Sequence, residues 1–148
     1  MLSVTLTTGR LHPALAGAVA AAAWGLLEPA DKRFFRSDYS DITLLGSLVT
    51  RGRLAQLGGF AIHVLNGAVF GLVFDQVQMR VSTDKRSLAL SMAMAEHVVV
   101  YPLSYFVDRF HPARGEAGIP PLLTNGRAFA QATVRHALFG VLLGRLSR

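Results

Sequence analysis

SLALSMAMAEHVVVYPLSYFV, residues 87–107, is an apolar segment long enough to cross a membrane as a helix. A transmembrane helix needs about 20 predominantly apolar residues. This segment supplies them and carries Glu96 and His97 near its middle. Polar groups in hydrocarbon are costly, so such side chains usually face the interior of a helical bundle. The segment therefore predicts a membrane helix with a polar inner face.

Further apolar segments of the same character lie on both sides of it. The expected spans cover roughly residues 13–28, 57–77, 88–107 and 128–146, and the first is short and rich in alanine. The chain has 148 residues, which is enough for one domain. We therefore expect a single integral membrane domain, residues 1–148, with an all-α fold: a four-helix transmembrane bundle.

Small residues recur within these segments at the spacing of close helix packing. The small-xxx-small pattern lets membrane helices approach one another closely, and it occurs in three of the four segments. It consists of Gly17, Ala21 and Gly25, then Gly67 and Gly71, then Gly140 and Gly144. We expect close helix contacts at these positions. The Gly140 and Gly144 face also suggests contact between copies in a homo-oligomer.

The composition excludes several classes of protein. The chain is 51% hydrophobic and only 16% charged, against about 25% charged residues in soluble domains. Its net charge of +6 is spread between the apolar segments and forms no nucleic-acid-binding motif, so no nucleic-acid partner is expected. The absence of cysteine excludes disulfides and thiolate chemistry. The sequence holds no soluble-enzyme motif, and we interpret it as non-enzymatic. A soluble four-helix bundle is the structural alternative.

The connections between the segments are unequal. In the long loop of residues 29–56, Ser40 or Asp41 is placed to cap a short helix in the 38–50 region. That helix is expected to be amphipathic and to lie at the membrane surface, or else to pack as an ordinary loop helix. Residues 108–127 are rich in proline and glycine and predict an irregular loop. Basic residues are divided too evenly to fix the orientation, and we interpret both termini as cytoplasmic.

A polar stripe follows the third segment. His97, Tyr101, Ser104 and Asp108 fall on one narrow face of a helix. Pro102 lies beside this stripe, where it is expected to kink the helix. Trp24 of the first segment is expected to act as an interfacial anchor.

The other segments offer polar groups at similar depths. With a rise of about 1.5 Å per residue, His63, His97 and His136 lie roughly 9 to 16 Å below the same membrane surface. We therefore expect an intramembrane cavity whose mouth is edged by Glu28 and Asp108. The residues expected to bind a ligand or ion are His63, Asn66, Glu96, His97, Tyr101, Arg135 and His136.

Three interpretations of this polar set remain open. One is a path or binding site for a proton, ion or small polar solute. Another is a haem- or metal-binding subunit with His63, His97 and His136 as candidate ligands, although no cofactor is required. The last is a structural accessory subunit of a larger membrane complex, in which Glu96 pairs with Arg135 across the helices.

Several short motifs resemble those of the YagU-like inner-membrane proteins of bacteria. They are Trp24-Gly25 followed by Glu28-Pro29, His63 followed by Asn66, His97 followed by Pro102, and His136 in the last segment. The resemblance implies a small, multi-spanning protein of the bacterial inner membrane, with the lipid bilayer as its first partner. It implies no particular reaction or substrate.

Overall fold

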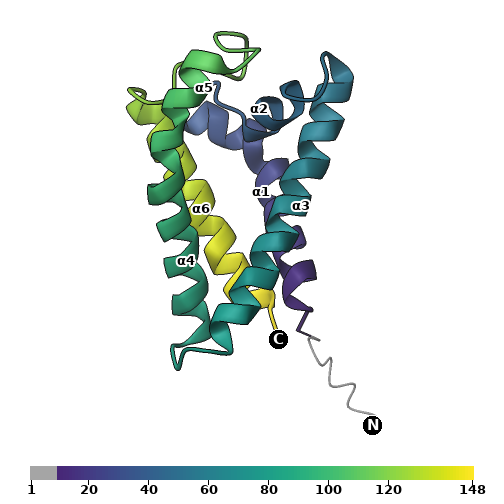
Figure 1. Cartoon of the computed structure of the whole chain (residues 1–148), viewed down its shortest axis with the longest axis vertical. Coiled ribbons are helices and arrows are strands. Elements are labelled where there is room, and N and C mark those ends of the chain that lie inside the picture. The colour runs from purple at the N-terminus through teal and green to yellow at the C-terminus, as the bar shows by residue number, and fades with distance from the viewer. Residues whose placement is uncertain (1–9) are drawn as a thin grey trace.

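The computed structural model describes residues 10–148, and within them the fold is helical, with one isolated β-bridge between Leu11 and Ser147. This confirms the expected all-α class. Figure 1 shows the arrangement of the helices. Their bounds are α1 Pro13–Phe35, α2 Asp41–Ser47, α3 Arg53–Gln78, α4 Lys85–Val100, the 3₁₀ turn η1 Tyr101–Leu103, α5 Ser104–Phe110 and α6 Gly126–Leu146.

Three helical stretches are long and apolar enough to cross a membrane. They are α1, α3 and the continuous run Lys85–Phe110, which joins α4, η1 and α5. This agrees with the first three expected spans. The fourth expected span, α6, is not in this group, and it carries Gln131, Arg135 and His136 along its length.

The long helices pack in two pairs. α1 packs along α3, α4 packs along α6, and contacts between α1 and α6 join the pairs. In Figure 1, α3 and α4 diverge from the turn that connects them, while α2 lies across the wide end between them. The two pairs are therefore closed on the α1–α6 side and open between α3 and α4.

The α1–α3 pair is held at backbone contact. A Cβ atom added to Gly17 would lie 2.0 Å from the carbonyl oxygen of Gly67, and one added to Gly71 would lie 2.1 Å from that of Pro13. No side chain fits at either place. The expected close packing at these glycines is found, and it allows the backbones of α1 and α3 to touch.

Gly140 and Gly144 make the corresponding contact on α6. A Cβ atom on Gly140 would lie 2.8 Å from the Cα of Leu90, and one on Gly144 would lie 2.9 Å from the Cα of Arg86. Both neighbours belong to α4 of the same chain. This glycine face is covered within the chain, which removes the reason for placing a second copy there.

Local signals in the sequence set several helix ends. Ser40 caps α2, because its Oγ accepts the backbone N–H of Thr43 at 2.9 Å. His12 caps α1 in the same way through Nδ1 and the N–H of Ala14. The expected break at Pro102 is present, since α4 ends at Val100 and a 3₁₀ turn leads into α5.

Gly71→Ala is expected to destabilise the protein by about 1–3 kcal/mol, because the new methyl group overpacks a backbone contact. The matched control is Gly58→Ala in the same helix, where a Cβ atom meets nothing within 4 Å. That change should be neutral or slightly stabilising, since alanine favours helix over glycine. Thermal unfolding of the detergent-solubilised protein compares the two. Equal effects would contradict the close α1–α3 contact.

Candidate functional site

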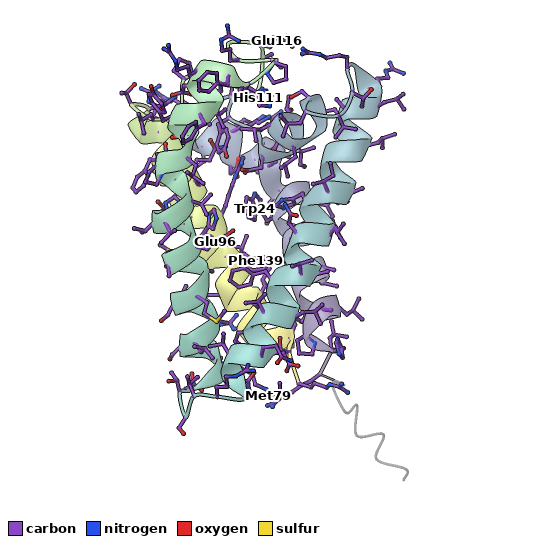
Figure 2. The ribbon with its side chains drawn as sticks, viewed as in Figure 1. Trp24, Met79, Glu96, His111, Glu116 and Phe139 are labelled. Carbon is purple, nitrogen blue, oxygen red and sulfur yellow. The ribbon has the colours of Figure 1, made fainter. Side chains whose placement is uncertain are left out.

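A cavity of about 280 Å³ lies between the two helix pairs. Residues from α1, α2, α3, α4 and α6 line it, and α5 closes it at the end that carries the long loops. Three of the residues that line it, Trp24, Glu96 and Phe139, lie about halfway along the helices (Figure 2). Met79 marks one end of the molecule in this view, and His111 and Glu116 mark the other. The cavity therefore extends from the middle of the helical body to the long-loop end, where Tyr39 and Leu122 of the connections line it.

Most of the residues predicted to form a site do line this cavity. They are His63, Asn66, Glu96, His97, Tyr101 and His136. Arg135 lies outside the cavity wall, and so do Glu28 and Asp108, which were expected at its mouth. Sequence reasoning did not include Tyr39 and Asp41, which also line it.

The three histidines gather around Trp24. The Trp24 ring lies edge-on to that of His63, with centroids 4.4 Å apart, and 5.4 Å from that of His136. His97 continues the cluster at 4.8 Å from His136. Trp24 is only 8% exposed, so the expectation of an interfacial anchor was wrong: the indole is a wall of the cavity.

Hydrogen bonds fix which nitrogen of His63 carries the hydrogen. Nε2 lies 3.1 Å from the carbonyl oxygen of Ala21, which can only accept, so Nε2 donates. A neutral ring then keeps a lone pair on Nδ1. No group among residues 10–148 donates to that atom.

The same argument holds for His97. Its Nε2 lies 2.9 Å from Thr133 Oγ1, and that hydroxyl donates its own hydrogen to the carbonyl of Phe129. Thr133 therefore accepts, and His97 Nε2 donates. The cavity wall thus contains two imidazole rings with free acceptor nitrogens.

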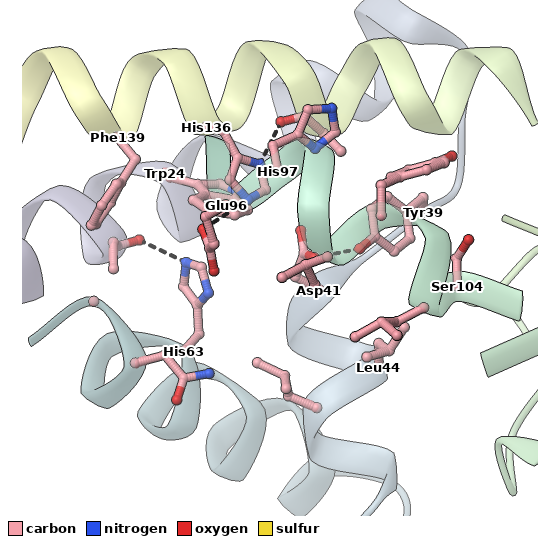
Figure 3. Close-up of a pocket in the computed structure, with 18 of the residues that line it drawn as sticks. Trp24, Tyr39, Asp41, Leu44, His63, Glu96, His97, Ser104, His136 and Phe139 are labelled. Atoms are coloured by element: carbon pink, nitrogen blue, oxygen red, sulfur yellow. Dashed lines mark hydrogen bonds and ion pairs between the residues drawn. The ribbon is translucent and has the colours of Figure 1, made fainter. Parts of the chain in front are cut away.

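His136 is paired with Glu96. Nδ1 of His136 donates to the carbonyl oxygen of Ala132 at 2.8 Å, and Nε2 lies 3.3 Å from a carboxylate oxygen of Glu96. Since Nε2 faces an acceptor, one proton must lie between ring and carboxylate. The interpretation in which Glu96 pairs with Arg135 is not what the structure has. Figure 3 shows Glu96 and His63 pointing toward one another.

Ser104 brings an unsatisfied hydroxyl to the other end of the cavity. Its Oγ is buried and has no hydrogen-bond partner within the described chain. The residue lines the cavity where α5 begins. A buried hydroxyl without a hydrogen-bond partner is costly. A polar atom of a bound molecule or a water at this end of the cavity would supply the missing partner.

Arg135 belongs to a separate, buried network of ion pairs and hydrogen bonds. Its side chain is 2% exposed and donates from Nη1 to Asp41 at 2.7 Å. Nη2 donates to Asp31 at 2.7 Å, and Nε donates to the second oxygen of Asp31. The guanidinium also faces the rings of Trp24 and Tyr39. These contacts tie α6 to α1, α2 and the connection between them.

Glu28 and Asp108 tie loops to helices. Glu28 accepts from Ser40 Oγ at 2.7 Å and pairs with Lys32 at 2.8 Å. Asp108 accepts the backbone N–H groups of Leu122 and Leu123 at 2.8 and 2.9 Å. Both carboxylates therefore do structural work outside the cavity.

Tyr39 joins the cavity to the Arg135 network. Its hydroxyl donates to Asp41. Burial, followed by the negative charge of Asp41, holds the pKa of Tyr39 well above its usual range. The phenol therefore remains a hydrogen-bond donor throughout the neutral pH range.

The cavity does not assemble a set of metal ligands. Within residues 10–148, no three His, Asp or Glu side chains come together in a way that could hold a metal ion. Instead, the His63 ring packs against Trp24 and the His97 ring packs against His136. Each of these two imidazoles also donates a hydrogen bond to a protein oxygen. The metal-ligand interpretation of the histidines gains no geometric support.

Arg135→Met is expected to destabilise the protein by about 3–5 kcal/mol, because it leaves buried carboxylates without their cation. The control is Arg145→Met, on an exposed position of the same helix. It should change stability little. Unfolding in detergent measures both variants, and a mild effect of Arg135→Met would show that the network does not hold the helices together.

Tyr39→Phe tests the hydrogen bond to Asp41 through its pH dependence. A raised pKa in the folded state gives stability that is full below the unfolded tyrosine value of about 10 and is lost as pH rises above it. The wild type should therefore exceed the variant in stability at neutral pH, and this difference should shrink above about pH 10. Unfolding midpoints from pH 7 to 11 measure it, and a constant difference would argue against a buried, protonated phenol.

Comparison of the chain with protein-family models, with curated proteins and with solved structures finds no match. The arrangement of the cavity is therefore the basis on which a function is assigned.

Proposed function

We propose that this chain is a small polytopic membrane protein whose interior cavity binds a small polar solute. The observation that carries the proposal is the cavity itself: apolar walls with a few polar groups left free. That composition is typical of small-molecule sites. Polar groups at membrane depth are costly unless they serve packing or a ligand, and the free ones here are not used in packing.

The proposal includes a fourth membrane span, α6. Its 21 residues reach about 31 Å, the thickness of the hydrocarbon core. Its modest hydropathy suits its position, because α1 and α4 flank it and Arg135 is buried against α1 and α2. A helix shielded by its neighbours needs fewer apolar residues than one that faces lipid.

Exposed aromatic residues support placing the long-loop end at a membrane surface. Phe34 on α1 and Phe106 and Phe110 on α5 are exposed near that end. Tyr105 on α5 is exposed in the same region, and tyrosine is enriched at membrane interfaces. In this proposal α2 lies just inside that surface and covers the cavity. Location in a bacterial inner membrane rests on the resemblance of the short motifs to the YagU-like proteins.

The open side between α3 and α4 gives the solute a route. Asn66 on α3 and Glu96 on α4 line the cavity and are both exposed, whereas His63 and His97 behind them are buried. The polar rim therefore lies in front of a more enclosed interior. A solute that enters past Asn66 and Glu96 reaches the Trp24 ring.

Trp24 is the single tryptophan of the chain, so its fluorescence reports on the cavity alone. We expect acrylamide, a small neutral polar solute, to quench it in detergent and in lipid nanodiscs. Val100→Phe should reduce the quenching constant severalfold, because Val100 lines the cavity. Val99→Phe is the matched control, since this neighbour on α4 is 73% exposed and lies outside the wall.

Two results would overturn the proposal. One is a Trp24 that acrylamide cannot reach in the wild type. The other is an equal response of the Val100→Phe and Val99→Phe variants, which would mean that the quencher arrives by a route other than the cavity. Matching unfolding temperatures of the two variants show that both are folded.

A further inference from the structure

We propose that the solute is a protonated organic amine, bound at Glu96 in exchange for the proton that Glu96 shares with His136. This inference rests on the proposed function and names its ligand class. It starts from the polar atoms that the cavity leaves unused. Their hydrogen-bonding character specifies the chemistry of the partner that would complete them.

The unused polar atoms of three wall residues, two of them buried and one at the rim, are acceptors. His63 and His97 each donate the Nε2 hydrogen to a protein oxygen and retain a lone pair on Nδ1. Glu96 has one oxygen against His136, and the other is unpaired. An ammonium group carries three N–H donors and no acceptor, so it is the complement of this set.

The charges on the wall also favour a cation. Among the residues that line the cavity there is no lysine or arginine, whereas Asp41 and Glu96 both contribute carboxylates. The two oxygens of Asp41 are already bound by Tyr39 and Arg135. Glu96 is therefore the carboxylate that remains for a ligand, and the one cationic group that an anion would meet on the wall, protonated His136, is already paired with Glu96.

The rest of the wall suits an apolar or aromatic body on the amine. Trp24, Phe70 and Phe139 line the cavity, and Phe70 lies edge-on to Phe139 with centroids 5.2 Å apart. Aromatic faces attract organic cations and pack against flat apolar groups. At the far end, the free hydroxyl of Ser104 is available to a polar substituent.

The proton count follows from the Glu96–His136 pair. Nδ1 of His136 keeps its hydrogen on the carbonyl of Ala132, so the shared proton lies between Nε2 and the carboxylate. When R–NH₃⁺ binds the Glu96 carboxylate, that proton leaves to solvent and His136 becomes neutral. One positive charge enters and one departs, so the charge of the site is unchanged and no bond of the amine is broken.

Other titratable groups face the pair from each helix around it. They are Asp41 on α2, His63 on α3, His97 on α4 and the phenols of Tyr39 and Tyr101, all lining the same cavity. Asp41 is held by Arg135, and the two imidazoles each donate to a fixed oxygen. The exchangeable proton is therefore assigned to Glu96 and His136, which are paired with each other and include the exposed carboxylate at the open rim.

Three matched probes test the ligand class: phenethylammonium, phenethyl alcohol and phenylacetate, each titrated against Trp24 fluorescence. We expect the cation to bind about tenfold or more tightly than the alcohol, since hydrogen bonds to charged groups are stronger, and the anion to bind least. Between pH 6 and 8 the affinity for the cation should rise with pH, by up to about tenfold per unit for one released proton.

Variants separate the roles of the pair. Glu96→Gln should abolish the preference for the cation over the alcohol while leaving alcohol binding in place. His136→Gln should retain the preference and lose the pH dependence, because no shared proton remains to be released. Glu116→Gln is the control, an exposed loop carboxylate at the long-loop end of the molecule.

The outcomes distinguish this inference from the proposed function. Equal binding of all three probes, or a cation preference that survives Glu96→Gln, would overturn the amine inference and leave solute binding intact. The amine inference would also be overturned if acrylamide quenches Trp24 through the cavity but none of the three probes changes the Trp24 fluorescence. If acrylamide also fails to reach Trp24, both proposals fall.

Discussion

The buried ion network of Arg135 is the interaction on which the arrangement of the helices depends. A guanidinium that is 2% exposed requires its full set of carboxylates, because an unpaired charge in a buried place costs several kcal/mol. Its partners, Asp31 and Asp41, lie on α1 and α2. Satisfying one side chain of α6 therefore positions the first two helices, and it brings Tyr39 and Asp41 to the cavity wall.

The cavity is a consequence of where the chain packs tightly. Glycines bring α1 onto α3 and α6 onto α4 at backbone distance, and the two pairs are linked chiefly by the α1–α6 contacts and the ion network. The pairs diverge on the opposite side, between α3 and α4 (Figure 1). Side chains that would otherwise be buried against a neighbour, such as Asn66 and Glu96, remain at an open rim.

The sequence allowed the helices, the break at Pro102 and the convergence of the three histidines to be predicted, because each follows from local spacing. Periodicity gives the face of a helix on which a residue lies. It does not give the rotation of one helix against another, and that rotation decides that Glu96 meets His136 and that Trp24 faces inward. The partners of Arg135 were missed for the same reason: Asp31 is separated from it by 104 positions.

The two charged clusters differ in one respect that bears on function. Arg135 finds its counter-charges, Asp31 and Asp41, within the chain, although Glu28 Oε2 and Gln131 Oε1 of the same buried region have no hydrogen-bond partner. The cluster around Glu96 is incomplete: one carboxylate oxygen and two imidazole nitrogens have no donor within the described chain. The two clusters also differ in burial, since the Glu96 side chain is 45% exposed and that of Arg135 is 2% exposed. The difference that supports the proposed ligand is therefore one of position: the free acceptors of the Glu96 cluster line an open cavity, whereas Arg135 is buried against carboxylates of its own chain.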